Sequence, residues 1–145
     1  GVRNYKKALK SRKELEVHTL RLIKSAIKDK DIAIRTEGKK NLSDQDLLTV
    51  FQTLIKQRKE SLEMYKKANR DNLVKKELDE INIIKSFLPY QLDEDEISEV
   101  IKNIIQNHNL NSLRDMGTIM GILKNKYSGQ IDLSLAGKVA KNILG

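Results

Sequence analysis

The chain has 145 residues, the length of a single domain or of one domain with a smaller companion. Cysteine is absent, so disulfides, thiolate catalysis and cysteine-ligated zinc or iron–sulfur sites are excluded. The formal net charge is +8, and the surplus lies in residues 1–40, which hold 13 Lys/Arg against 5 Asp/Glu. Such a segment suits a polyanion, either RNA or an acidic membrane surface, or is a solvated helix face.

Apolar residues recur at spacings of three and four through most of the chain, which predicts helices. Aromatic residues make up only 4%, whereas strands favour aromatic and β-branched residues in alternation. We therefore predict an all-α protein, with an N-terminal four-helix unit followed by a small three-helix C-terminal unit. No apolar run approaches the roughly 18 residues of a membrane span, and we expect no membrane partner.

The first two predicted helices cover residues 4–10 and 13–35, separated by a polar break at Lys10-Ser11-Arg12. The second has an apolar stripe that includes Val17, Ile23 and Ile34. Its opposite face is predicted to be basic, with Arg21, Lys24, Lys28 and Lys30.

The third predicted helix begins after the cap Ser43 and ends near residue 68, and the fourth begins at the cap Asp71. Arg58 falls on the inner, apolar stripe of the third helix. A guanidinium there needs a carboxylate partner, and Glu77 and Glu80 of the following helix are the candidates.

Pro89 is the only proline of the chain, and it predicts a helix end near Leu88. Four residues later, Asp93 caps another predicted helix, with Glu96 reaching back to the cap amide. Because this joint separates two helical regions, we predict an N-terminal domain over residues 1–90 and a C-terminal three-helix domain over residues 91–145.

The C-terminal domain contains three short predicted helices, and the middle one carries Gly117 and Gly121 on one face. Each glycine costs about 1 kcal/mol relative to alanine in a helix, so we expect a close contact at this face that offsets the cost. One interpretation is close packing of another helix. The other is close approach of a nucleic-acid backbone, with Arg114, Lys124 and Lys126 contacting phosphates.

No independent active site is visible. His18 and His108 are the only histidines, and neither has a catalytic signature nearby, so His18 is interpreted as an edge or core histidine. The run Asp93–Glu96 is explained by helix capping, and phosphate-binding, dinucleotide and metalloprotease motifs are absent. We therefore expect no catalytic residue, no metal site and no cofactor.

Three separated motifs resemble the YqeY-like proteins: residues 56–61, Lys-Gln-Arg-Lys-Glu-Ser, with the residues up to Leu73; residues 88–92, Leu-Pro-Tyr-Gln-Leu; and residues 115–117, Asp-Met-Gly. The resemblance covers about Leu9 to Leu144. It implies an all-helical protein with a larger N-terminal and a smaller three-helix C-terminal part. Members often carry lysine at the position of Thr118 and Gly-x-Ala-Asp at residues 129–132, where this chain has Gly-Gln-Ile-Asp.

The family is similar to the C-terminal tail of the B subunit of the glutamine-dependent aspartyl/glutamyl-tRNA amidotransferase. The resemblance implies a link to carbon–nitrogen ligase activity with glutamine as amide donor. In that enzyme the tail holds tRNA, while amide transfer takes place in other domains and subunits. This chain resembles the tail alone.

The leading hypothesis is a non-catalytic tRNA- or RNA-binding module. The alternatives are an accessory subunit that docks on an amidotransferase or another protein, and a purely structural interaction protein. The candidate phosphate-binding residues are Arg21, Lys24, Lys28, Lys56, Lys59, Arg114, Lys124, Lys126 and Lys138. Gly1-Val2-Arg3 resembles a processing edge, which leaves the compartment open between cytoplasm, mitochondrion and plastid.

Overall fold

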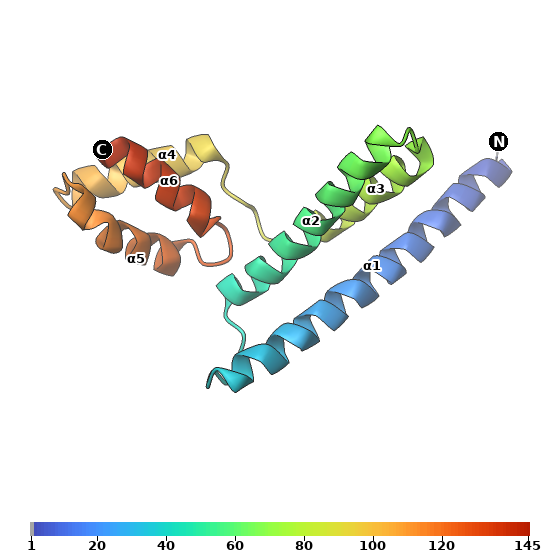
Figure 1. Ribbon diagram of the computed structural model, residues 1–145, viewed down its shortest axis with the longest axis horizontal. Helices are drawn as coiled ribbons and strands as arrows, with labels where there is room; N and C mark the ends of the chain where they lie inside the picture. Colours follow the sequence, from blue (N-terminus) through green and yellow to red (C-terminus); the bar gives the residue numbers. More distant parts are fainter. Residues whose placement is uncertain (1) are drawn as a thin grey trace. The chain divides into compact units, whose positions relative to one another are not determined.

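The computed structural model describes residues 2–145, with side chains from Arg3 onward. Helices account for all the regular structure in this range, which confirms the all-α prediction (Figure 1). The elements are α1 (Val2–Thr36), α2 (Asp44–Lys67), α3 (Asp71–Ser86), α4 (Glu94–Asn107), the 3₁₀ turn η1 (Leu113–Asp115), α5 (Met116–Lys126) and α6 (Leu133–Leu144). Gly1, part of the predicted first domain, lies outside the described residues.

The chain divides into two compact units between Leu88 and Pro89. The first contains α1, α2 and α3, and the second contains α4, α5 and α6 with the turn η1. Whether the predicted domains 1–90 and 91–145 fold independently stays a prediction.

The first unit has three helices within residues 2–88, and the predicted fourth is absent because the break at residues 10–12 does not exist. Residues 2–36 contain neither glycine nor proline, so no strong helix breaker is present. Lysine and arginine are good helix formers, and Arg12 pairs with Glu16 one turn later at 3.2 Å. A polar stretch alone therefore did not end the helix.

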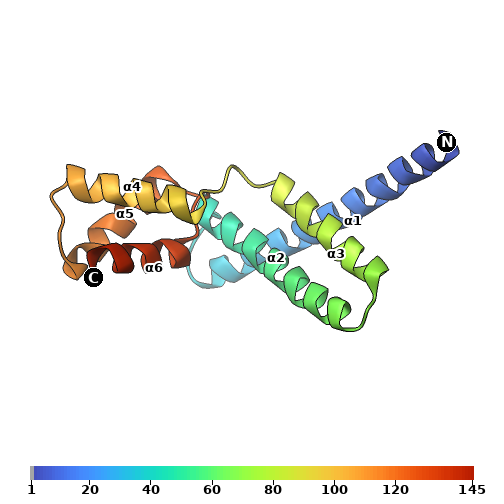
Figure 2. The same cartoon turned by 90° about the horizontal axis from the view of Figure 1, so that it is seen from above.

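The core of the first unit is formed by α2, α3 and the C-terminal half of α1. Its buried residues are Ile23, Val50, Phe51, Leu54, Ile55, Ile81 and Ile84. In contrast, residues 3–14 of α1 are all exposed, and the N-terminal tip of the helix projects past α2 and α3 (Figure 2). Leu78 of α3 is 44% exposed.

Ser43 caps α2 as predicted. Its hydroxyl oxygen accepts the Asp46 amide at 3.0 Å, and the Asp46 carboxylate accepts the Ser43 amide at 2.9 Å. That backbone hydrogen bond lowers the pKa of Asp46, and the charges of Lys39 and Lys30 add to the effect. The prediction for α3 was wrong: Asp71 is its first helical residue, and Arg70 occupies the cap position without a side-chain hydrogen bond.

The helix end before Pro89 is confirmed, since α3 ends at Ser86. The capping box of α4 is also confirmed: the Asp93 carboxylate accepts the Glu96 amide at 2.8 Å, and Glu96 accepts the Asp93 amide at 3.1 Å. The connecting residues are tied to the second unit. The Leu92 amide donates to the Gln130 carbonyl at 2.9 Å.

The second unit buries a core of its own, as the three short predicted helices require. Its buried residues are Ile97, Ile101, Ile104, Ile119, Leu123, Ile131, Ala136, Val139 and Ala140. Asp132 caps α6, accepting the Ser134 amide at 2.9 Å. Such short helices are marginal alone, so their stability comes from this shared core.

Candidate nucleic-acid interface

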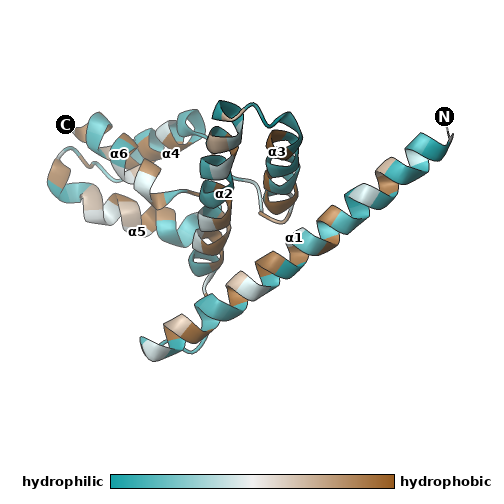
Figure 3. Ribbon diagram, turned by 45° about the vertical axis from the view of Figure 1, so that its right-hand side comes forward, coloured by the Kyte–Doolittle hydropathy of each residue, from teal (hydrophilic) through white to brown (hydrophobic). Residues whose placement is uncertain are grey.

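A row of cations follows the exposed side of α1. Residues three or four positions apart lie on one face of an α-helix, and six exposed basic residues share that spacing. We call this set the basic stripe: Lys6, Lys10, Lys13, Arg21, Lys24 and Lys28. Ile23 and Ile34, in contrast, are 3% and 1% exposed in the core. Figure 3 shows how hydrophilic and hydrophobic residues alternate along the helix.

The stripe is interrupted once, at Val17, which is 48% exposed and lines a shallow depression together with Lys10, Lys13 and Arg21. The prediction that Val17 belongs to the apolar stripe was therefore wrong. Lys30 was also misplaced, because it is half-buried and its charge acts on Asp46 at the start of α2.

The stripe cations are free of intramolecular ion pairs. Within residues 3–145, the ion pairs of α1 join Arg12 to Glu16 and Arg35 to Asp31, and neither arginine belongs to the stripe. Positive charges that are exposed and not neutralised by a neighbour are available to an external anion. The stripe is therefore the strongest candidate anion surface of the first unit.

The other predicted contacts are divided between the two units. Lys56 and Lys59 are exposed on α2 in the first unit. In the second unit, the Lys126 ammonium lies 5.9 Å from the centre of the Tyr127 ring. The remaining predicted cations of that unit are exposed as well: Arg114, Lys124 and Lys138. Residues 93–145 hold 6 Lys/Arg against 7 Asp/Glu, so this unit has no excess of positive charge.

Gly117 and Gly121 are both exposed on α5. A Cβ built on either glycine would have no neighbouring atom within 4 Å. No other helix of the second unit therefore packs closely against them, and within this unit the interpretation of close helix packing is wrong. Approach of a nucleic-acid backbone stays a prediction.

Arg58, at the centre of the motif over residues 56–61, is structural. Its Nε donates to a Glu80 carboxylate oxygen at 3.0 Å, and its Nη1 donates to the Leu54 carbonyl at 3.0 Å. The predicted pairing is confirmed with Glu80. Burial and the charge of Glu80 raise the pKa of the other candidate, Glu77.

His18 and His108 are both exposed. His18 was interpreted as either an edge or a core residue, and its exposure shows that it does not lie in the core. Within residues 3–145, no three His, Asp or Glu side chains lie close enough together to hold a metal ion. None of the helices described is long and apolar enough to cross a bilayer.

Lys6, Lys10 and Lys13 were missed as part of the candidate surface. The signal was present, because their spacing continues the spacing of Arg21, Lys24 and Lys28. The supposed break at residues 10–12 concealed it.

The fold defines an all-α protein in which three longer helices precede a small helical unit, with a basic stripe on the first helix. The chain belongs to the YqeY family, since the family described as Yqey-like protein matches residues 2–144.

Curated relatives share part of this sequence. The chain is 40% identical over 86 residues to "Altered inheritance of mitochondria protein 41, mitochondrial" from Lachancea thermotolerans, covering 59% of this chain and 44% of that protein. It is 37% identical over 82 residues to the protein of the same name from Kluyveromyces lactis, covering 57% and 43%. The chain thus spans less than half the length of these relatives.

Proposed function

We propose that this chain is a non-catalytic RNA-binding module, and that the basic stripe of α1 is its main contact surface. The observation that supports this most is the stripe itself: six exposed cations without intramolecular partners along one face. From Lys6 to Lys28 the stripe extends roughly 33 Å, at about 1.5 Å per residue. Such a row can neutralise several phosphates of one RNA backbone.

The composition of the stripe indicates which part of an RNA it would contact. Proteins that hold single strands combine cations with aromatic side chains on which bases stack. Tyr5, the only aromatic residue of α1, lies 18 residues, or about five turns, before the buried Ile23 and hence on the opposite face from the stripe. Binding through lysine and arginine alone would therefore be phosphate-directed and tolerant of sequence.

Transfer RNA is the RNA that we propose first, because the family resembles the tail that holds tRNA in the amidotransferase. The relatives have "mitochondrial" in their names, so we propose a mitochondrial tRNA. Anisotropy titration of labelled tRNA at two salt concentrations tests the proposal. An affinity that is absent at low salt, or that does not change with salt, would contradict it.

The accessory-subunit alternative predicts a different result. In that case, purified protein would not bind tRNA, but it would bind a purified glutamine-dependent amidotransferase. Titrating the two ligands side by side separates these functions.

A further inference from the structure

The basic stripe has one long interval, between Lys13 and Arg21. Elsewhere its neighbouring cations are three or four residues, or about 4.5–6 Å, apart along α1, whereas these two are eight residues, or about 12 Å, apart. The shallow depression at Val17 occupies this interval, and its volume is about 440 Å³. Glu14 and His18 line it as well. The middle of an otherwise cationic row is therefore apolar and carries one carboxylate.

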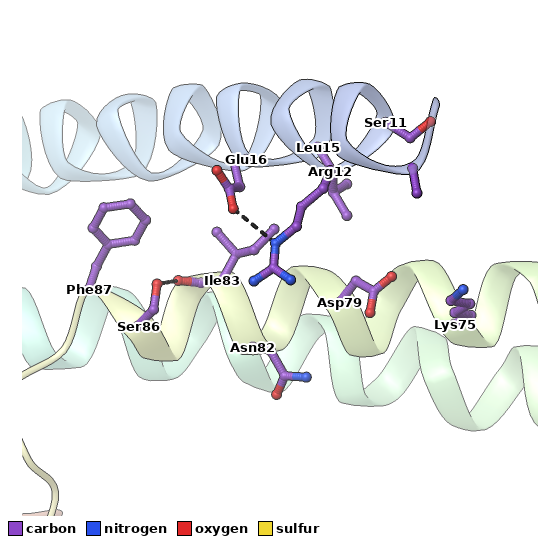
Figure 4. Close-up of a pocket in the computed structure, with 11 residues that line it drawn as sticks. Ser11, Arg12, Leu15, Glu16, Lys75, Asp79, Asn82, Ile83, Ser86 and Phe87 are labelled. Atoms are coloured by element: carbon purple, nitrogen blue, oxygen red, sulfur yellow. Dashed lines mark hydrogen bonds and ion pairs between the residues drawn. The ribbon is translucent and has the colours of Figure 1, made fainter. Parts of the chain in front are cut away.

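Glu14 supplies the carboxylate of this depression. Its side chain is exposed, and within residues 3–145 it forms no ion pair. The other carboxylate in the first half of α1, Glu16, is paired with Arg12 at 3.2 Å on the side that faces α3 (Figure 4). A carboxylate repels phosphate but accepts hydrogen bonds from hydroxyl groups. The part of an RNA that lies over Glu14 should therefore be a sugar rather than a phosphate.

An RNA duplex presents sugars and phosphates side by side. A-form RNA has a wide, shallow minor groove that displays the ribose 2′-hydroxyls, and proteins recognise it through contacts to these hydroxyls and to phosphates. With phosphates held by Lys13 on one side of the depression and by Arg21 on the other, the sugar between them would lie on Val17. Its 2′-hydroxyl would then be within reach of the Glu14 carboxylate.

We infer that this depression is a ribose-binding subsite, in which Glu14 accepts a hydrogen bond from a 2′-hydroxyl and thereby makes α1 prefer RNA to DNA. His18, one turn after Glu14, provides a second hydrogen-bonding group at the edge of the depression. The inference rests on the proposed RNA-binding function and deepens it. Because every ribonucleotide carries a 2′-hydroxyl, the preference needs no base recognition and agrees with binding that is tolerant of sequence.

Three hairpins of one sequence test the inference: RNA, 2′-O-methyl RNA and DNA. Each has a stem of about 16 base pairs, the length that double-stranded RNA-binding domains span. The 2′-O-methyl RNA keeps the A-form but has no hydroxyl hydrogen to donate. Fluorescence anisotropy gives the affinity of the full chain for each hairpin at one salt concentration. We expect the RNA to bind at least about tenfold more tightly than either of the other two.

Matched variants assign this preference to one side chain. Glu14→Ala removes the acceptor, and Asp29→Ala removes the same charge from another exposed carboxylate of α1, outside the depression. Loss of a negative charge strengthens the binding of all three hairpins, so the ratio of their affinities is the informative quantity. Glu14→Ala should reduce the RNA preference to less than about threefold, and Asp29→Ala should change it by less than about twofold. Glu14→Gln keeps a carbonyl acceptor and should retain an intermediate preference.

Circular dichroism spectra show whether each variant retains its helices. Salt-dependent binding with equal affinities for the three hairpins would overturn the inference and leave the proposed function standing. Equal binding of RNA and 2′-O-methyl RNA would also overturn it, because the A-form shape would then account for any preference over DNA. The same holds for an RNA preference that survives in Glu14→Ala, or that Asp29→Ala removes equally. If neither the hairpins nor tRNA bind, the proposed function fails and the inference fails with it.

Discussion

Arg58 of α2 and Glu80 of α3 form an ion pair of 3.0 Å whose side chains are only 12% and 6% exposed. It joins the two helices that form most of the first core. Glu77 is the other carboxylate that the sequence offered as a partner for Arg58. It lies close enough to Glu80 for the two negative charges to repel.

Breaking this pair should destabilise the first unit strongly. Arg58→Met leaves the Glu80 carboxylate buried without a partner, and we expect a loss of about 3 kcal/mol in the free energy of unfolding. Arg12→Met, which breaks the exposed pair with Glu16, should cost less than about 1 kcal/mol. Urea denaturation measures both, and equal losses would contradict the structural role given to Arg58.

The pKa of Glu77 is raised above its ordinary value of 4.5, first by burial and then by the charge of Glu80. A carboxyl group with a raised folded-state pKa stabilises the fold below its unfolded pKa, and that contribution is lost as pH rises through the folded pKa. Glu77→Gln should therefore raise the thermal midpoint at pH 7. It should also weaken the decline of the thermal midpoint as the pH rises above about 4. Melting curves across this range test it, with the exposed Glu60→Gln as control. A decline as steep as in the wild type would contradict the assignment.

The pKa of Asp115 is lowered, in contrast to the raised pKa of Glu77. Hydrogen bonds from the Asn111 and Ser112 amides, at 3.0 and 3.2 Å, hold the pKa of its carboxyl below 3.8. Its stabilising contribution is present above the unfolded pKa and is lost as pH falls through the folded pKa. Asp115→Asn should lower the thermal midpoint at pH 7. It should also reduce the fall of the thermal midpoint when the solution is acidified to about pH 3. An unchanged acid branch of the stability curve would show that this group does not contribute.

Gln91 ties the joint to the second unit. Its side-chain amide donates to the Pro89 and Gly129 carbonyls, each at 2.8 Å. Gln91→Ala should destabilise the second unit by about 1–2 kcal/mol. Hydrogen exchange should become faster in α4, α5 and α6 and stay unchanged in α2 and α3, whereas the exposed Gln106→Ala should alter neither set. Faster exchange in α2 would contradict the assignment of this contact to the second unit.

The helices of the C-terminal unit were predictable because their caps, Asp93 and Asp132, and their apolar spacing agree with one another. The continuity of α1 does not follow from its apolar spacing, because residues 10–12 interrupt that spacing with polar side chains, although none of them opposes a helix. For Gly117 and Gly121 the sequence shows two glycines on one helix face, but not whether another part of the protein packs against that face. The depression at Val17 is not visible in the sequence either, because the apolar spacing assigns Val17 to the core.

The central claim concerns the basic stripe, and replacing part of it tests the claim most directly. The variant carries Arg21→Gln, Lys24→Gln and Lys28→Gln, and its matched control loses the same charge at three exposed lysines outside the stripe: Lys66, Lys67 and Lys102.

Fluorescence anisotropy gives the affinity of each protein for labelled tRNA between about 50 and 200 mM salt. Each lost phosphate contact should reduce the slope of log affinity against log salt by about 0.7–0.9, so we expect a reduction of about 2 to 3 for the stripe variant and little change for the control. Equal slopes for the stripe variant and the wild type would contradict the proposal that this face of α1 holds RNA.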